Sequence, residues 1–240
     1  DTERVVAIVP IVLDAINFVA DYYEQNITRR YDDPNMLLLQ ENEDPYFYIE
    51  RLTMPKLIVN GVGDEFQQPD DTHYWWKDMP EPKAFLLMPN TDHSTILGIL
   101  QEVPDIVTFL MYLLTRTPMP TATWTISPDT GDITASLHYP EAVKGPVYAT
   151  PALANATMWY GKTCTKGATG KRRDFRYSSL DDPCECGVMT DGTCFNKESV
   201  GWKSVPLQVQ ADGTYVAHMD ADPSGAWTGF FIDFTFERPE

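Results

Sequence analysis

The 240-residue sequence lacks several motifs that announce a biochemical activity. It contains no phosphate-binding glycine loop, no dinucleotide fingerprint and no cluster of metal-ligating residues. It also contains no G-x-S-x-G turn, the sequence that presents a nucleophilic serine at the end of a strand. We therefore predict no metal site and no cofactor, and we predict that no complete serine-dependent site lies within these residues.

Long apolar runs and positive charge are also scarce. The longest mostly apolar stretch, residues 106–114, is shorter than the roughly 18 to 20 residues of a membrane span. Lys and Arg number 18 against 35 Asp and Glu, so the formal net charge is −17. Such an excess of negative charge argues against nucleic acid or an anionic membrane surface as the main partner. We predict neither a nucleic-acid partner nor a membrane span.

Cysteine is scarce and confined to one loop-rich stretch. The four cysteines are Cys164, Cys184, Cys186 and Cys194. An even number in a short stretch predicts two disulfide bonds, in which Cys184 and Cys186 each pair with Cys164 or Cys194. Zinc binding is the alternative, but it would lack a C-x-x-C pair and a nearby histidine.

Two N-x-S/T sequons, at Asn26 and Asn155, predict N-glycosylation. Together with the predicted disulfides they favour a secreted, extracellular or lumenal protein. Residues 1–4 lead directly into an apolar segment, so we expect no signal peptide in this chain. That expectation is compatible with secretion, because maturation removes a signal peptide.

Residues 1–116 alternate strand patterns with helical patterns. Apolar runs predict parallel strands at residues 5–12, 56–60 and 84–88. Helical spacing predicts helices at residues 14–24, 69–77 and 96–114. Pro34 is expected to break the chain, and Asp44 to cap a short helix that begins at Pro45. This order predicts an α/β domain with a parallel sheet covered by helices on both faces.

Three strands do not complete such a sheet. The apolar strand at residues 5–12 would lie unpaired at one edge, which native proteins avoid. We therefore expect an N-terminal half of the same precursor, or a separate chain, to complete the sheet.

Residues 117–240 have a different character and are predicted to form a second domain. A proline-rich linker at residues 117–120 precedes short alternating segments that are separated by Gly, Pro and Asp. The predicted strands are residues 122–126, 133–138, 156–160, 174–178, 215–219 and 227–236. This pattern predicts a small immunoglobulin-like β-sandwich, with the cysteine-containing stretch as an insertion.

Asp64 and His93 each follow an apolar strand of the first domain. The carboxyl ends of parallel strands meet at the edge where α/β proteins gather their catalytic groups. A carboxylate there can orient an imidazole and stabilise its protonated form. We predict Asp64 as the acid and His93 as the base of a triad, with Glu65 and Asp92 as alternative acids. The simpler alternatives are that Asp64 caps a turn and that His93 is a surface residue.

Asp14 and Asn17 follow the first strand and are expected at the same edge. They are our candidate substrate-binding residues, because a carboxylate at this edge could hold a substrate amine. The alternative is that Asp14 caps the following helix.

Several stretches of the chain resemble the PhoPQ-activated pathogenicity-related family, which includes the autocrine proliferation repressors. In the first half they are residues 4–14, 43–46, 51–60, 63–66, 69–70 and 89–94. In the second half they are residues 173–176, 213–217 and 225–231. The stretch that contains the four cysteines departs from the family pattern as an insertion.

The resemblance implies the C-terminal half of an α/β-hydrolase-like domain, related to prolyl-oligopeptidase-type peptidases, followed by a β-sandwich. It places Asp64 and His93 at the acid and base positions, with the serine before residue 1. Two functions follow as hypotheses. The chain is part of a secreted serine-hydrolase-like protein that acts on a peptide substrate, or it is a non-catalytic signalling or assembly protein that binds a cell-surface receptor.

Overall fold

The computed structural model describes residues 4–13, 15, 33–141, 148–163, 173–176, 178–179, 188–190, 193–195 and 200–238. The chain divides into two compact units, residues 1–103 with 174–200 and residues 104–173 with 201–240. The boundary lies inside helix α4 (Ile99–Thr115), before the linker at which the sequence suggested it. The stretch 174–200 returns to the first unit.

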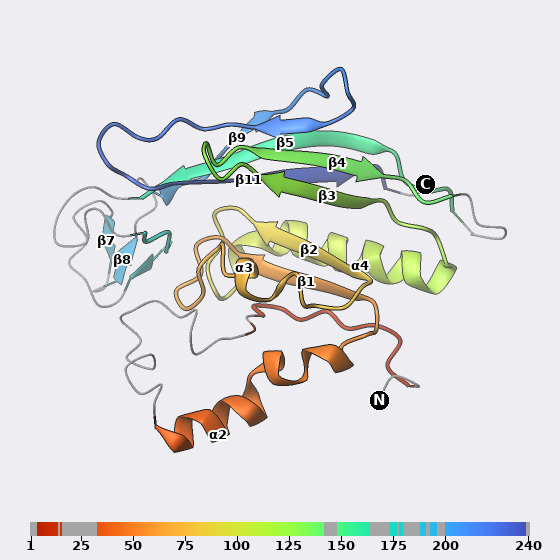
Figure 1. Cartoon of the computed structure of the whole chain (residues 1–240), viewed down its shortest axis with the longest axis horizontal. Coiled ribbons are helices and arrows are strands. Elements are labelled where there is room, and N and C mark those ends of the chain that lie inside the picture. The colour runs from red at the N-terminus through yellow and green to blue at the C-terminus, as the bar shows by residue number, and fades with distance from the viewer. Residues whose placement is uncertain are drawn as a thin grey trace. The chain divides into compact units, whose positions relative to one another are not determined.

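The first unit contains a parallel pair of strands, β1 (Lys56–Gly61) and β2 (Lys83–Met88). They pair in register from Lys56 opposite Lys83 to Gly61 opposite Met88 (Figure 1). Burial explains the apolar sequence of β1, since all its residues except Asn60 are buried. Both predicted strands are therefore confirmed, and their carboxyl ends lie at one edge of the sheet.

The predicted strand at residues 5–12 pairs with β1 on the side away from β2, through parallel bridges at Ile8 and Ile11. The backbone N–H of Ile8 donates to the Pro55 carbonyl, and that of Val12 donates to the Val59 carbonyl. Pro10 lies between them and has no N–H to donate. The pairing is thus as predicted, but the missing donor leaves separate bridges instead of a continuous strand.

The helices of the first unit agree only partly with the sequence analysis. Helix α2 (Pro34–Glu43) begins at the proline that was expected to break the chain, with Asp33 as its N-cap. Proline is well suited to a first helical turn, where its missing N–H costs no hydrogen bond. The 3₁₀ helix η3 (Pro45–Arg51) is capped by Asp44 as predicted. The helix predicted at residues 69–77 is shorter, namely α3 (Thr72–Trp75), and that at 14–24 lies outside the described residues except for Ala15.

The predicted helix at residues 96–114 is confirmed as η4 (Ile96–Gly98) followed by α4. Within the described residues, this Ile96–Thr115 segment is long and apolar enough to cross a membrane by length and composition. Core helices of soluble proteins satisfy the same criterion, and Glu102 and Asp105 lie within the segment. The absence of a membrane span stays a prediction.

The second unit contains two three-stranded antiparallel sheets (Figure 1). One has the order β10 (Tyr215–Ala217), β4 (Ile133–His138), β3 (Thr121–Ile126), and the other β11 (Thr228–Phe236), β5 (Leu153–Lys162), β9 (Lys203–Pro206). The ring of Tyr215 in the first sheet meets that of Phe234 in the second, with centroids 5.2 Å apart. The aromatic alternation of the last strand therefore contributes to a core between the sheets. The immunoglobulin-like strand order stays a prediction.

One predicted strand of this region is wrong over most of its length. Residues 174–176 form no strand: the Asp174 carboxylate accepts the backbone N–H of Arg176, so this donor is used in a local turn, and it also accepts the Arg176 guanidinium. The short strand β6 (Ser178–Ser179) follows and belongs to a small sheet with β8 (Thr193–Phe195) and β7 (Val188–Thr190).

Cys194 lies on β8, but its side chain is outside the described part of the structure. The other three cysteines, Cys164, Cys184 and Cys186, lie outside the described residues altogether. The two disulfide bonds therefore stay a prediction.

Candidate active site

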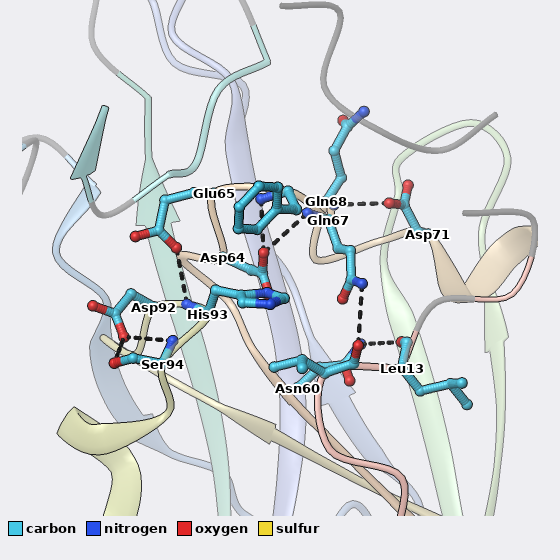
Figure 2. A network of polar contacts seen from close by, with 12 residues as sticks. Leu13, Asn60, Asp64, Glu65, Gln67, Gln68, Asp71, Asp92, His93 and Ser94 are labelled. Atoms are coloured by element: carbon cyan, nitrogen blue, oxygen red, sulfur yellow. Dashed lines mark hydrogen bonds and ion pairs between the residues drawn. The ribbon is translucent and has the colours of Figure 1, made fainter. Parts of the chain in front are cut away.

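The structure brings Asp64 and His93 together at the carboxyl edge of the parallel pair. Asp64 follows β1 and His93 follows β2, and the His93 Nδ1 lies 2.8 Å from the Asp64 Oδ2. Figure 2 shows the imidazole directly beside the Asp64 carboxylate. The predicted proximity of the two side chains is confirmed, while their catalytic roles stay predictions.

The Asp64 carboxylate is only 1% exposed, and both of its oxygens are used. Oδ2 bonds the imidazole, while Oδ1 accepts the backbone N–H groups of Phe66 at 2.7 Å and Gln67 at 3.1 Å. Buried carboxylates need such donors, because desolvation otherwise disfavours the charged form. Asp64 therefore caps a turn, as the simpler interpretation predicted, and the same carboxylate bonds His93. Its role as the acid of a triad stays a prediction.

The hydrogen bond to Asp64 determines which ring nitrogen of His93 is free. With Nδ1 directed at a carboxylate, Nδ1 is assigned the proton in the neutral imidazole and Nε2 is left as the acceptor. Nε2 has no hydrogen-bond partner within the described part of the chain, and 36% of the side chain is exposed. The Phe66 ring and the imidazole pack in a T-shaped arrangement, with centroids 4.6 Å apart and an angle of 69° between the ring planes. This is the arrangement that a general base requires.

Surrounding negative charge raises the pKa of His93 above its usual value. The largest cause is the hydrogen bond to Asp64, which partial burial of the ring opposes. The charges of Asp64, Glu65 and Asp92 add to the rise. These carboxylates therefore stabilise the imidazolium that forms when His93 accepts a proton.

The backbone of the His93 loop lies against the end of β1. The Gly63 N–H donates to the Thr91 carbonyl at 2.9 Å. A Cβ on Gly61 would lie 2.5 Å from the Thr91 oxygen and 2.8 Å from the Asp92 oxygen. Only glycine at position 61 allows this approach, so it helps to set the distance between the two catalytic candidates.

The two alternative acids do not bond the imidazole. Glu65 accepts the backbone N–H of His93 at 2.9 Å, and Asp92 accepts the N–H and hydroxyl of Ser94 (Figure 2). The imidazole bonds Asp64 instead. Geometry therefore selects Asp64 from the three carboxylates that the sequence offered.

Two amide side chains that the sequence analysis missed hold the end of the first strand. Gln67 Nε2 donates to the Val12 carbonyl at 3.1 Å, and Asn60 Nδ2 donates to the Leu13 carbonyl at 2.8 Å. Val12 has a φ of 53°, in the left-handed region that β-branched residues rarely adopt. Both bonds therefore hold a turn that the chain would otherwise disfavour. No local sequence signal identifies them, because their partners are backbone groups of a distant segment.

The candidate substrate-binding residues Asp14 and Asn17 lie outside the described residues, as does the sequon at Asn26. The sequon residue Asn155 lies on β5 opposite Thr235 and is exposed. Glycosylation at both sites stays a prediction.

A second histidine–carboxylate pair lies in the second unit and was not anticipated. His218 Nδ1 lies 2.5 Å from Asp132 Oδ1, and Nε2 lies 3.3 Å from Asp220 Oδ1. Across the described ranges, no group of three or more His, Cys, Asp or Glu residues could hold a metal ion.

Comparison with known proteins identifies relatives of this chain. Residues 1–176 match the model of a family described as PhoPQ-activated pathogenicity-related protein. Autocrine proliferation repressor protein A of Dictyostelium discoideum is 28% identical over 254 aligned residues, which cover 96% of this chain and 46% of that protein. The chain thus spans about half the length of this relative. No solved structure matches.

Proposed function

Because the chain belongs to the PhoPQ-activated pathogenicity-related protein family, we propose that it supplies two members of a serine-hydrolase-like site. In this proposal Asp64 is the acid, His93 is the base, and the serine lies outside these 240 residues. The observation that carries the proposal is the hydrogen bond of 2.8 Å from His93 to a buried carboxylate, with Nε2 left unpaired in the described structure. We infer a peptidase-type reaction on a peptide substrate.

The proposed chemistry follows from the two ring nitrogens. Nε2 takes the proton from the serine hydroxyl while the serine oxygen forms a bond to the substrate carbonyl carbon. The protonated imidazole then gives that proton to the leaving amine as the carbon–nitrogen bond breaks. Asp64 stays ionised, orients the ring through Nδ1 and stabilises the imidazolium. Water completes the reaction by releasing the acyl group from the serine.

Two further observations support the proposal that the serine and the rest of the sheet lie outside these 240 residues. Among the described residues, the outermost segment of the sheet on one side is residues 5–12, where Val6 is 76% exposed and Ile11 44%. The chain covers 46% of the repressor protein that it resembles. We propose that an N-terminal half of the same precursor, or a separate chain, completes an α/β-hydrolase-like sheet and brings the serine.

A second candidate function comes from the name of the relative, autocrine proliferation repressor protein A. That name describes an autocrine repressor of proliferation, and a hydrolase scaffold can serve such a role without catalysis. In this alternative the chain belongs to a secreted protein that binds a cell-surface receptor or assembles with a partner. The exposed sequon residue Asn155 and the four cysteines support secretion under either function.

Fluorophosphonate labelling of the longest natural form of the protein tests the enzyme proposal. We expect one serine to be labelled, and we expect labelling to be lost in His93→Ala, because in this proposal His93 is the base that removes the serine proton. His218→Ala is the matched control, since it removes a histidine that also bonds an aspartate but has both ring nitrogens occupied. Its labelling should equal that of the wild type.

Two results would contradict the enzyme proposal. One is a folded, intact protein that no fluorophosphonate labels, and the other is labelling that His93→Ala leaves unchanged. The first result, combined with receptor-dependent binding to cells, would establish the signalling alternative.

A further inference from the structure

Consecutive residues of the loop after β1 bond two different parts of His93. The Asp64 side chain bonds the imidazole Nδ1 at 2.8 Å, and the Glu65 side chain accepts the His93 backbone N–H at 2.9 Å. Figure 2 shows both carboxylates directed at the same residue, from a segment nearly thirty positions earlier in the chain. His93 is therefore attached through its main chain and its side chain at once.

This double attachment restricts the imidazole more than the Asp64 bond alone could. A single bond to Nδ1 allows the ring to follow the carboxylate while the backbone of its loop moves. A second bond, at the backbone N–H, also fixes the position of the His93 backbone to which the side chain is attached. Bonds to a charged acceptor are also shorter and stronger than neutral ones, so Glu65 is a suitable anchor.

We propose that Glu65 is a positioning residue of the hydrolase-like site: its carboxylate anchors the His93 backbone and so keeps the imidazole against Asp64. The inference rests on the proposed function for its catalytic meaning, but not for its structural content. Glu65 does not touch the reacting atoms in this scheme. It acts only through His93.

Asp92 is the matched comparison for Glu65. Its charge also contributes to the raised pKa of His93, but its side chain bonds Ser94 and not the His93 backbone. Replacing Asp92 with Asn therefore removes a nearby charge and leaves the anchor intact. Any effect that Glu65 exerts by charge alone should be reproduced by Asp92→Asn.

Three variants separate the anchor from the charge. Glu65→Asp keeps the charge but shortens the side chain by one methylene, so it loses the bond to the His93 N–H. Glu65→Gln keeps the length and an acceptor oxygen but loses the charge. Asp92→Asn loses a charge elsewhere in the loop. All three are small changes at residues that are not fully buried, so the fold should tolerate them.

The direct readout is hydrogen exchange at histidine amides. The chain has four histidines, so selective ¹⁵N-histidine labelling of the full chain produces only four backbone amide signals. We expect exchange at His93 to be about tenfold faster in Glu65→Asp, because a hydrogen bond to a charged acceptor is lost there. Glu65→Gln keeps a neutral and therefore weaker acceptor, so exchange at His93 should accelerate by less than in Glu65→Asp. Asp92→Asn should exchange at close to the wild-type rate. The His73 amide, which donates to the Asp70 carbonyl, serves as an internal reference.

A second readout is the pKa of His93 in the same samples. Glu65→Gln and Asp92→Asn should both lower it, because each removes one negative charge near the ring. Glu65→Asp should also lower it, although the charge is retained, because the bond to Asp64 becomes less well held. A structural role unrelated to His93 would leave this pKa unchanged in Glu65→Asp.

The proposal is overturned if Glu65→Asp leaves His93 exchange and pKa as in the wild type. It is also overturned if Glu65→Gln accelerates exchange as much as Glu65→Asp does, since charge and not the bond would then matter. Neither measurement needs catalysis. A protein that shows the expected exchange but never reacts with a fluorophosphonate would refute the hydrolase function and leave the anchor established.

Discussion

The two histidine–aspartate pairs of this molecule use the same chemical groups in different surroundings. In the first unit, His93 bonds a carboxylate that is 1% exposed and that also accepts two backbone N–H groups. In the second unit, the side chains of His218 and Asp132 are 54% and 29% exposed. The distance between ring nitrogen and carboxylate is short in both, at 2.8 and 2.5 Å.

The difference between the pairs lies in the second ring nitrogen and in the carboxylate. His218 directs Nε2 at Asp220, so both of its nitrogens face acids, whereas Nε2 of His93 has no partner in the described structure. Both histidines have a raised pKa, caused first by the hydrogen bond to Asp64 or to Asp132. A short distance and a raised pKa therefore do not distinguish a candidate base from a surface ion pair. A candidate base is distinguished instead by the burial of its acid and by a ring nitrogen that has no partner in the described structure.

The largest expected difference between the pairs concerns reactivity. Asp64→Asn should slow fluorophosphonate labelling of the longest natural form by about 10⁴-fold, because an amide favours the wrong tautomer of the imidazole. Asp132→Asn should leave the rate unchanged. Labelling rates of the purified variants check this prediction, and equal rates for both variants would remove the distinction between the pairs.

A smaller effect on stability is expected from Gly61, which lies against the loop that carries His93. Gly61→Ala should lower the free energy of unfolding by about 2 kcal/mol, because its Cβ would overlap the Thr91 and Asp92 carbonyls. In Gly213→Ala, in the second unit, the added Cβ meets no atom within 4 Å. The free energy of unfolding should therefore fall only by the backbone strain of a φ of 85°, about 1 kcal/mol. Urea unfolding measures both costs.

The two glycine variants should also differ at His93. Only Gly61→Ala should shift the ¹⁵N-histidine signal of His93, because the added methyl displaces the loop that carries it. An unshifted His93 signal in a destabilised Gly61→Ala protein would show that the overlap is relieved elsewhere.

The smallest effect is a pH dependence of stability. A raised pKa in the folded state means that the charged His93–Asp64 pair stabilises the fold fully below the unfolded pKa of about 6.5. This contribution is lost as the pH rises through the folded pKa. The stability gap between wild type and Asp64→Asn should therefore narrow from pH 6 to pH 9. Urea unfolding at both pH values measures that gap.

The free energy of unfolding of Asp132→Asn should differ little from that of the wild type at either pH, because water and salt screen the exposed pair of the second unit. Added NaCl should likewise lower the pKa of His218 more than that of His93. A gap for Asp132→Asn as large as that for Asp64→Asn would mean that burial of the acid is not what separates the pairs.

The catalytic candidates could be predicted because they depend on local patterns. Asp64 and His93 each follow an apolar run, and parallel strands bring their carboxyl ends to one edge. Helix α2 was missed although its signals are local, since Asp33 and Pro34 are a good N-cap and first residue. Strand β9 was missed for another reason: its exposed sequence has no alternation, and it exists because β5 offers it a partner.

The sequence by itself determined that β1, β2 and the Ile96–Thr115 helical segment follow one another, and that an acid and a histidine follow the two strands. Its resemblance to known sequences indicated the family. The strands, the helix and the two candidate residues follow from the periodicity and spacing of residues close together in the chain. The tertiary structure decided that Asp64 and not Glu65 or Asp92 bonds the imidazole, and that Glu65 bonds the backbone of His93. Adjacent carboxylates look equivalent in a sequence, because only the folded loop determines which oxygen meets a donor from a segment nearly thirty residues away.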